Sequence, residues 1–361
     1  MLFKSIIAGA SALVSLSAAA PVDSRASSNV IEGSYIVKLK DNVAADEHIS
    51  WVAYVEADQI WTLEESAVKR DLTTQESAPW GLAAISHREA NAAGYIHDTA
   101  AGAGTFGYVV DSGVRTTHQE FEGRASTGWT GYPGDESDTL GHGTHVAGTV
   151  GGKTFGVAKK ATIISVKVFQ GKEGSTSIVL AGFDWAVNDI ISKGRRDKSA
   201  INLSLAGPYS RAWNEAVRTA FTKGVLSIVA AGNAQADAGN YSPASAPNAV
   251  TVGAVNQNWG IVTDWPVGQG SNYGTVLDIF APGDNILSAG FNSDSESRFD
   301  SGTSMAAPHV TGLALYAISV DGVRGAKAVT DHLIKNSGKG VVTGPLRGSP
   351  NRFANNGNPS Q

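Results

Sequence analysis

Cysteine is the residue type that this chain lacks altogether: none of its 361 residues is a Cys. This absence excludes a disulfide scaffold, a cysteine nucleophile and a thiolate metal site. Charge is also sparse, because Asp, Glu, Lys and Arg make up 17% of the residues, against a usual value of about 25%. Disordered chains and coiled coils need far more charge, so both classes are excluded.

The sequence also lacks an excess of basic residues and a long apolar run. Its 28 basic and 33 acidic residues give a net charge of −5, which does not favour a nucleic-acid or membrane partner. After the first 20 residues no segment reaches the length of apolar sequence that a membrane span needs. Glycine, in contrast, is abundant with 42 residues, and this predicts many tight turns and close backbone approaches.

The first 20 residues have the pattern of a secretory signal peptide. A basic start at Lys4 is followed by an apolar stretch from Ile6 to Leu16 and by small residues up to Ala20. That stretch is too short to anchor the chain in a bilayer. We therefore expect a signal peptide over 1–20 and a secreted, extracellular protein; an N-terminal core helix is the less favoured alternative.

Residues 21–70 differ in composition from the rest of the chain and end in the dibasic pair Lys69–Arg70. They contain two strand-like runs, 35–39 and 53–56, with many acids and little glycine. A dibasic pair is often only a solvated charge pair, but at a composition shift in a secreted chain it favours a processing site. We predict a propeptide over 21–70 and a mature domain over 71–361.

From Ala78 onward, buried strand-like runs alternate with helical periodicity. This alternation predicts an α/β fold with a doubly wound parallel sheet that is flanked by helices. Ligands of such sheets bind beyond the carboxyl ends of the strands. The predicted strands are 105–110, 163–169, 200–205, 225–231 and 249–255, and the predicted helices are 178–191, 211–223 and 305–319.

One glycine-rich motif lacks the flanking elements that its usual function needs. Gly102–Gly107 fits the G-x-G-x-x-G pattern of dinucleotide-binding proteins. That pattern needs a strand before it and a helix after it, so that the helix N-terminus holds a pyrophosphate. Here a strand follows instead, and a nicotinamide enzyme is therefore disfavoured.

Three segments together hold a nucleophile, a base and an orienting carboxylate. Asp111 ends a predicted strand, His142 lies in Gly141–Gly148, and Ser304 lies between a glycine-bearing turn and an apolar helix. Taken singly, these residues are also typical of a turn, a helix and a helix N-cap. A serine attacks only when a base takes its proton, and the base needs a carboxylate to fix its tautomer. The combination therefore favours nucleophilic catalysis.

A metal site is the alternative for the two histidines of this segment. His142 and His145 are three residues apart and could both ligate from one helix face. No Glu lies between them, so the H-E-x-x-H arrangement of zinc peptidases is absent. We interpret His142 as a general base and His145 as a supporting group in the helix.

The chain order Asp, His, Ser resembles that of the subtilisin superfamily. The segments Gly141–Gly148, Gly302–Ala306, Ser77–Leu82, Phe155–Lys160 and Ser242–Ser245 are similar to those of its proteinase K group, and most similar to fungal oryzin-type extracellular alkaline proteases. The resemblance spans nearly all of 71–361. It implies a subtilisin-like serine endopeptidase, made as a zymogen, that hydrolyses proteins and peptides with broad specificity and prefers bulky apolar or aromatic residues before the cut.

The resemblance also implies a role for individual residues. Ser304 would attack the scissile carbonyl, His142 would transfer the proton, Asp111 would orient His142, and Asn233 would stabilise the oxyanion. A structural Ca²⁺ would be held by the Asp278 carboxylate and two carbonyls, although Asp278 could also be a plain strand-end residue. The implied substrate-binding residues are Gly171, Gly174, Ser175, Ser204, Leu205, Ala206, Ala230, Ala231 and Gly232, and the implied calcium carbonyls are those of Pro247 and Ala249. No catalytic metal and no organic cofactor are implied, and a monomer is expected.

The chain departs from the family pattern in four places. Ala206–Pro208 replaces a run of glycines at the substrate edge, and the methyl group of Ala206 is expected either to narrow the pocket or to shift the bound substrate strand. Trp265–Val267 is an unfamiliar segment, and Gly270 replaces a usual Phe. Residues 21–70 resemble only the first and last strands of the inhibitory propeptide, so we expect that they cannot form its usual four-stranded fold.

Rival functions follow from these departures. A catalytically silent or poorly matured protein that uses the same fold as a binding surface is the main alternative, and the intact set of Asp111, His142, Asn233 and Ser304 argues against it. A sedolisin-type acid peptidase is disfavoured because its base is a carboxylate.

Asn240 is a weak candidate for N-glycosylation.

Overall fold

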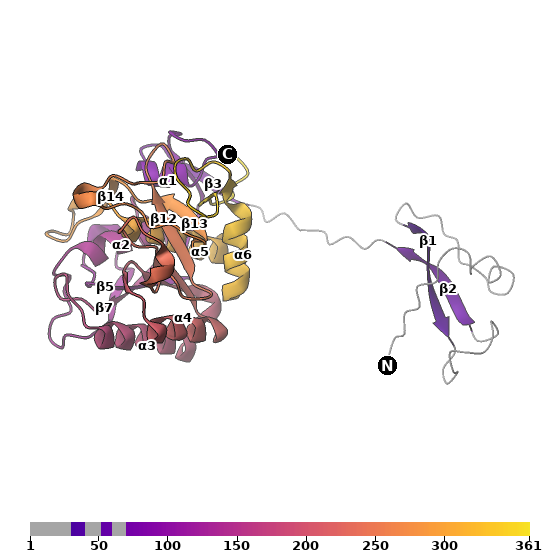
Figure 1. The fold of residues 1–361 in the computed structure, drawn as a ribbon, viewed down its shortest axis with the longest axis horizontal. Coiled ribbons are helices and arrows are strands. Elements are labelled where there is room, and N and C mark those ends of the chain that lie inside the picture. Colours follow the sequence, from indigo (N-terminus) through magenta and orange to yellow (C-terminus); the bar gives the residue numbers. More distant parts are fainter. Residues whose placement is uncertain (1–29, 40–51, 60–69) are drawn as a thin grey trace. The chain divides into compact units, whose positions relative to one another are not determined.

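The fold is that of a computed structural model, which describes residues 30–39, 52–59 and 70–361 (Figure 1). The chain divides into two compact units, Met1–Val68 and Lys69–Gln361. In the first unit, β1 (Val30–Leu39) pairs antiparallel with β2 (Val52–Gln59), as the two strand-like runs predicted. The predicted signal peptide and the remainder of the propeptide lie outside the described residues.

A nine-stranded sheet forms the centre of the second unit, in the order β16-β17-β13-β12-β10-β8-β5-β7-β6. Every neighbouring pair is parallel except β16 with β17. Both faces of this sheet are covered, which explains why its central strands are continuous runs of apolar residues. The strands are β5 (Phe106–Asp111), β6 (Ala125–Thr130), β7 (Thr162–Lys167), β8 (Ser199–Leu203), β10 (Leu226–Ala230), β12 (Val250–Val255), β13 (Ile279–Pro282), β16 (Gly338–Lys339) and β17 (Arg352–Phe353).

Two helical layers cover the sheet and confirm the predicted α/β class. Alternate residues of each strand point to opposite faces. On β5, Val109 packs with α2 and α5, whereas Tyr108 and Val110 pack with α3 and α4. Figure 1 shows α3 and α4 together along one side of the sheet. The helices are α1 (Trp80–Ala84), α2 (His142–Gly151), α3 (Thr176–Ser192), α4 (Arg211–Thr222), α5 (Thr303–Val320) and α6 (Ala326–Asn336).

Short strand pairs lie outside the main sheet. β3 (Leu72–Gln75) pairs with β4 (Tyr95–Asp98), and β14 (Ile286–Ala289) pairs with β15 (Ser297–Asp300) just before α5. Within the second unit, β9 (Gly207–Pro208) pairs with β11 (Tyr241–Ser242) beside the end of β8. The β14–β15 and β9–β11 pairs hold loops at the carboxyl edge of the sheet, where β5 ends at Asp111 and β10 is followed by Asn233.

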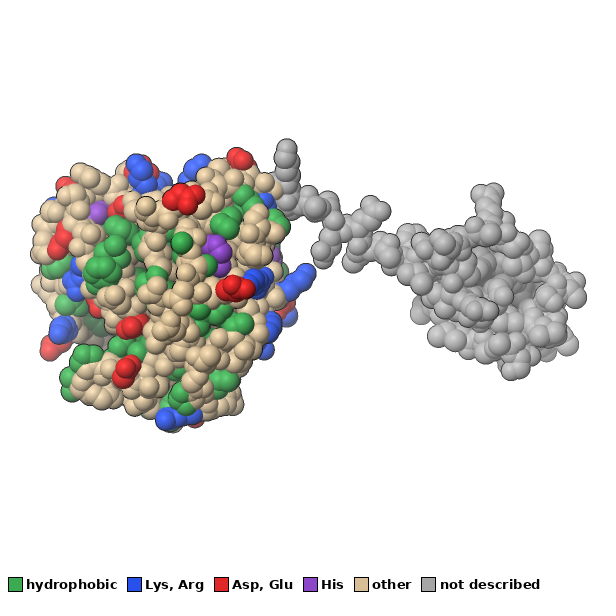
Figure 2. All heavy atoms as spheres, turned by 90° about the horizontal axis from the view of Figure 1, so that it is seen from above, with side chains coloured by type: hydrophobic (Ala, Val, Ile, Leu, Met, Phe, Trp, Pro, Cys, Tyr) green, Lys and Arg blue, Asp and Glu red, His purple; other side chains and the backbone are tan. Residues whose placement is uncertain are grey.

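The G-x-G-x-x-G segment has a structural role. Gly102 has a φ of 83°, and a Cβ there would lie 2.7 Å from the backbone nitrogen of Ala161. The segment leads directly into β5, so it lacks the helix that a dinucleotide would need. Among the residues that the structure describes, no helix has the length and apolar character of a membrane span. On the face shown in Figure 2, charges are scattered and form no large patch of one sign.

Candidate active site

Asp111 and His142 form a hydrogen-bonded pair at the carboxyl edge of the sheet. Asp111 is the last residue of β5 and is 2% exposed, and His142 is the first residue of α2. The Nδ1–H of His142 donates to Asp111 Oδ1 at 2.7 Å, and Ser112 N donates to the same oxygen at 2.7 Å. Because a carboxylate can only accept, this bond fixes the tautomer of His142 and leaves its Nε2 free to accept a proton.

The charge of Asp111 also sets the proton affinity of His142. Burial by itself lowers the pKa of His142, because it penalises the charged imidazolium. The charge and hydrogen bond of Asp111, with smaller contributions from Asp300 and Asp138, outweigh burial and raise the pKa above its usual value. The imidazole is therefore a stronger base than a free histidine.

Asp138 supports this pair, and the sequence analysis missed it. Its carboxylate accepts a hydrogen bond from Ser112 Oγ at 2.8 Å and one from Thr144 Oγ1 at 2.6 Å. The same carboxylate accepts from the backbone nitrogen of Gly141, just ahead of α2. Asp138 thus ties the segment after β5 to the start of α2. No local signal distinguishes it from an ordinary loop aspartate.

Two further contacts hold the same region together. A Cβ at Gly143 would lie 2.1 Å from the carbonyl oxygen of Gly113, so only glycine lets α2 approach so closely. Lys167, at the end of β7, is buried and donates from Nζ to the carbonyl oxygen of Ser112 at 2.8 Å. Burial lowers the pKa of this lysine. Lys167 lies opposite Asp111 on the neighbouring strand, and no sequence motif indicated this.

Ser304 is the second residue of α5. The N-cap residue Gly302 has no side chain to cap this helix, and within residues 70–361 the backbone N–H of Ser304 has no acceptor. Ser304 Oγ donates to the carbonyl oxygen of Ser204 at 3.1 Å, and Ser204 Oγ donates back to the carbonyl oxygen of Ser304 at 2.7 Å. In residues 70–361 no hydrogen bond joins Ser304 to His142. The Ser304 hydroxyl is therefore bonded to the segment that follows β8 rather than to its predicted base.

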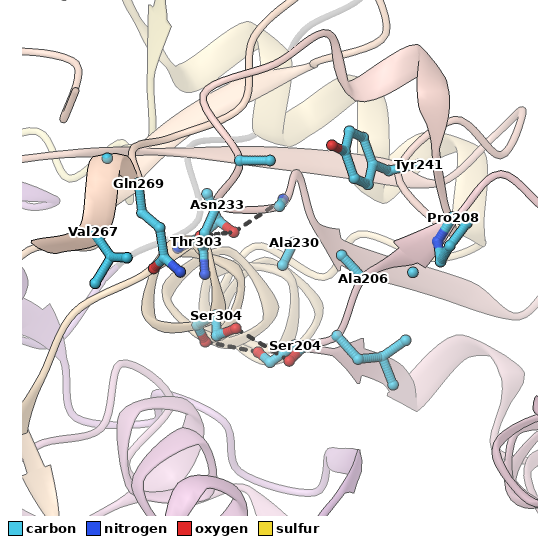
Figure 3. A pocket seen from close by; sticks show the side chains of 15 residues that line it. Ser204, Ala206, Pro208, Ala230, Asn233, Tyr241, Val267, Gln269, Thr303 and Ser304 are labelled. Atoms are coloured by element: carbon cyan, nitrogen blue, oxygen red, sulfur yellow. Dashed lines mark hydrogen bonds between the residues drawn. The ribbon is translucent and has the colours of Figure 1, made fainter. Parts of the chain in front are cut away.

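The amide of Asn233 is held in one orientation. Its Oδ1 accepts from the backbone nitrogen of Thr303 at 2.9 Å and from Thr303 Oγ1 at 2.8 Å. A backbone N–H can donate only to the amide oxygen, so the NH₂ group is the free end of this side chain. Figure 3 shows Asn233 and Ser304 beside the same pocket.

A cavity of about 640 Å³ brings most of the predicted substrate residues together, and we call it the Ser304 cavity. Ala231 is buried and does not line it. Gly174 and Ser175 line a neighbouring cavity of about 700 Å³, with Tyr132 and Phe169, but Gly171 does not. The predicted residues that line the Ser304 cavity are Ser204, Leu205, Ala206, Ala230, Gly232, Asn233 and Ser304.

The predicted calcium residues lie at the opposite end of β12 from this cavity. Asp278 is half-buried, and its Oδ2 accepts from the backbone nitrogen of Thr251 at 2.8 Å. Burial raises the pKa of Asp278 to about 6, against the effects of that hydrogen bond and the charge of Arg352. Pro247 and Ala249 shortly precede Thr251, on either side of a residue with a left-handed φ of 68°. One carboxylate and nearby carbonyls are hard oxygen donors.

The two histidines of α2 do not form a metal site. His142 is engaged with Asp111, and His145 Nε2 is hydrogen-bonded to the carbonyl oxygen of Ile286 at 2.8 Å. Burial lowers the pKa of His145 to about 4 and keeps it neutral. Across the described part of the chain, no three His, Cys, Asp or Glu residues are grouped to hold a metal ion.

Comparisons with known proteins agree on one family. The subtilase family matches residues 102–353. Alkaline protease 1 of Aspergillus clavatus is 55% identical over 306 residues, which cover 85% of this chain and 73% of that protein. Subtilisin-like proteinase Mp1 of Magnaporthiopsis poae is 43% identical and covers 94% of this chain and 95% of its own length. The crystal structure of a cold-adapted subtilisin-like serine proteinase superposes with a TM-score of 0.70 at 37% identity, over 78% of this chain and 98% of that one.

The raised pKa of His142 gives a prediction that needs only the folded protein. A histidine-ring NMR titration should find His142 titrating above its usual value, and Asp111→Asn should lower that pKa because the carboxylate charge is removed. His97 on β4, whose pKa is lowered mainly by burial and not affected by Asp111, is the internal control, and its pKa should be the same in both proteins. An unchanged His142 titration in Asp111→Asn would contradict this account of the pair.

Proposed function

The chain belongs to the subtilase family and is a serine endopeptidase of the subtilisin type, and on this premise we propose that it cleaves proteins through Asp111, His142 and Ser304. The observation that carries the proposal is the 2.7 Å bond between His142 Nδ1 and Asp111 Oδ1, which leaves Nε2 as a free base. Broad specificity, with bulky apolar or aromatic residues preferred before the cut, belongs to the same proposal.

The first chemical step requires a movement of Ser304. Its hydroxyl leaves the carbonyl oxygen of Ser204 by rotation about χ1 and donates to His142 Nε2 instead. Catalytic hydrogen bonds are often loose in free enzymes and tighten when substrate binds. Ser304 Oγ then attacks the scissile carbonyl carbon while its proton passes to His142 Nε2. Asp111 stabilises the imidazolium that results, because its charge already raises the pKa of His142.

The negative charge of the tetrahedral intermediate falls on the former carbonyl oxygen. The free NH₂ group of Asn233 and the backbone N–H of Ser304 donate to it, at the start of α5. The imidazolium then gives its proton to the leaving amine, and the C–N bond breaks. Water repeats the sequence on the acyl-enzyme, with His142 as the base, and releases the acid and Ser304.

The proposed specificity rests on the Ser304 cavity. Leu205, Ala206 and Ala230 give it apolar walls, which favour a bulky apolar or aromatic side chain before the cut. The methyl group of Ala206 narrows this space relative to glycine. The substrate backbone would pair as an added strand with Ser204–Ala206 on one side and with the segment 171–176 on the other.

Ser304→Ala should abolish both proteolysis and labelling by a serine-directed fluorophosphonate, because the nucleophile is lost. Asn233→Ala should lower kcat by on the order of 10²–10³ with little change in KM, the size known for such a donor in subtilisin itself, a member of this family. Ser192→Ala, an exposed serine at the end of α3, is the matched control and should keep full activity.

Labelling and casein hydrolysis would be measured on protein whose N-terminus has been verified. If correctly matured protein shows no Ser304-dependent labelling, the chain is a silent member of the fold that acts as a binding surface.

We further propose that residues 1–20 direct secretion, that 21–70 inhibit the enzyme until removed, and that the mature enzyme is a monomer starting at Asp71. The Arg70 guanidinium donates to Asp321 Oδ1 at 2.6 Å and to the carbonyl oxygen of Gly357 at 2.7 Å. The backbone nitrogen of Asp71 donates to Asp98 Oδ2 at 2.6 Å. Cleavage between Arg70 and Asp71 would therefore create an ammonium group next to a carboxylate that already holds it.

Mass spectrometry of the secreted protein should find Asp71 as its first residue. Asp98→Asn should lower the Tm of the mature protein more than that of an Arg70→Gln precursor, because only the mature form has the ammonium charge. Equal losses of Tm in the two forms, or a different first residue, would contradict this junction.

Calcium is proposed as a structural ion at Asp278, with the carbonyls of Pro247 and Ala249. Within residues 70–361 the half-buried Asp278 carboxylate accepts one hydrogen bond, and this bond and the charge of Arg352 do not offset its burial, so a bound cation would stabilise it. Calcium would supply charge and cross-linking there, and no chemical step passes through it.

Added Ca²⁺ should raise the Tm of the mature enzyme, and EDTA should reverse the effect. A ligand that binds only the folded state at 100 times its Kd stabilises by about 2.7 kcal/mol. Asp278→Asn should remove this response, whereas the exposed control Asp197→Asn should keep it. The site is refuted if Asp278→Asn responds to Ca²⁺ as the unmodified enzyme does, or if neither responds.

A further inference from the structure

The segment Trp265–Gln269, which we call the Trp265 loop, contains an unusual residue. Val267 has a left-handed backbone, with φ 63° and ψ 31°, and its side chain is 95% exposed. A β-branched residue in this region is strained. Because the Val267 side chain is exposed, its burial does not offset this strain. Folding alone therefore gives no reason for a valine at this position.

The Trp265 loop is held at its base. Trp265 is 8% exposed, and its Nε1 donates to Asp284 Oδ1 at 2.8 Å. Gln235 Nε2 donates to the carbonyl oxygen of Thr263 at 3.0 Å, just ahead of the loop. Trp265 and Gln269 also form an antiparallel bridge. These contacts hold Val267 in a fixed position, as a binding element requires.

Val267 and Gln269 lie between two cavities. One is the Ser304 cavity, and the other, of about 720 Å³, we call the Trp265 cavity. Val267, Gln269 and Asn233 line both. Figure 3 shows Val267 and Gln269 on one side of Asn233, with Ala206 and Pro208 on the other. The two side chains form a ridge that separates the cavities next to the proposed oxyanion donor.

This arrangement fixes which substrate residue can enter the Trp265 cavity. In the proposed function, the scissile carbonyl points at Asn233 and the side chain before the cut occupies the Ser304 cavity. Side chains of an extended peptide alternate between two faces. The next side chain on the same face is two residues further along, about 6.6 Å away, and belongs to the second residue after the cut.

We propose that the Trp265 cavity binds the second residue after the cut and selects a long basic side chain there. The inference rests on the proposed protease function. Val267 and Phe299, which is 59% exposed, offer apolar surface to the stem of a lysine or arginine. Asp264 lines the cavity with an exposed carboxylate, and no lysine or arginine of residues 70–361 lines it. Asp300 also lines the cavity but contributes less negative charge, because Arg298 forms an ion pair with it at 3.2 Å.

The test uses peptides that are identical except at the second residue after the cut, with Lys, Leu or Glu there. We expect kcat/KM to be about tenfold higher for Lys than for Glu, and this ratio to fall in 1 M salt. Asp264→Asn should reduce the ratio severalfold. Asp331→Asn, an exposed aspartate on α6, is the matched control and should leave the ratio unchanged.

Val267→Gly separates a binding role from a structural one. Glycine adopts the left-handed backbone freely, so the Tm should not fall, whereas KM for the Lys and Leu peptides should rise severalfold. A lower Tm with unchanged peptide selectivity would overturn the proposal and make Val267 a structural residue.

A short substrate whose chromogenic leaving group replaces all residues after the cut cannot reach the Trp265 cavity. It therefore separates a failure of this inference from a failure of the proposed function. If the unmodified enzyme cleaves it but treats the Lys and Glu peptides equally, only the inference on the Trp265 cavity fails. If it does not cleave the short substrate or any peptide, the proposed function fails.

Discussion

The bond between Asp111 and His142 is the constraint on which the site depends. A carboxylate that is 2% exposed is costly unless it is paired and hydrogen-bonded. The end of β5, the start of α2 and the Asp138 network all serve to bring His142 Nδ1 to that carboxylate. The same charge that makes the buried pair tolerable also raises the basicity of His142, so stability and reactivity come from one interaction.

The central architecture was predictable because burial leaves a simple signature. β5, β7, β8, β10 and β12 are covered on both faces, and their apolar runs locate them to within about two residues. The amphipathic helices α3 and α4 were equally clear. Short elements such as β14, β15 and β17 could not be found, since their residues pair only through tertiary contacts that no local pattern records.

The sequence suggested the main residues of the candidate site, but not the contacts that support them or the resting rotamer of Ser304. Asp111, His142 and Ser304 came from motifs, and Asn233 from resemblance. The supporting roles of Asp138 and Lys167 depend on contacts with Ser112, a residue distant in sequence, and so have no local signal. The resting bond of Ser304 to Ser204 is a rotamer choice, which is decided by the surrounding backbone rather than by the motif.

The Trp265 loop shows how selectivity can change while the chemistry stays fixed. Its anchors, Trp265 with Asp284 and Gln235 with Thr263, are separate from the hydrogen bonds that hold Asp111 and His142. Strain at Val267 can therefore be accommodated without disturbing the base. Natural sequences break local conformational rules mainly at functional sites. The Trp265 loop, where the backbone of Val267 is strained, lines the same cavity as Asn233, next to the proposed path of the peptide beyond the cut.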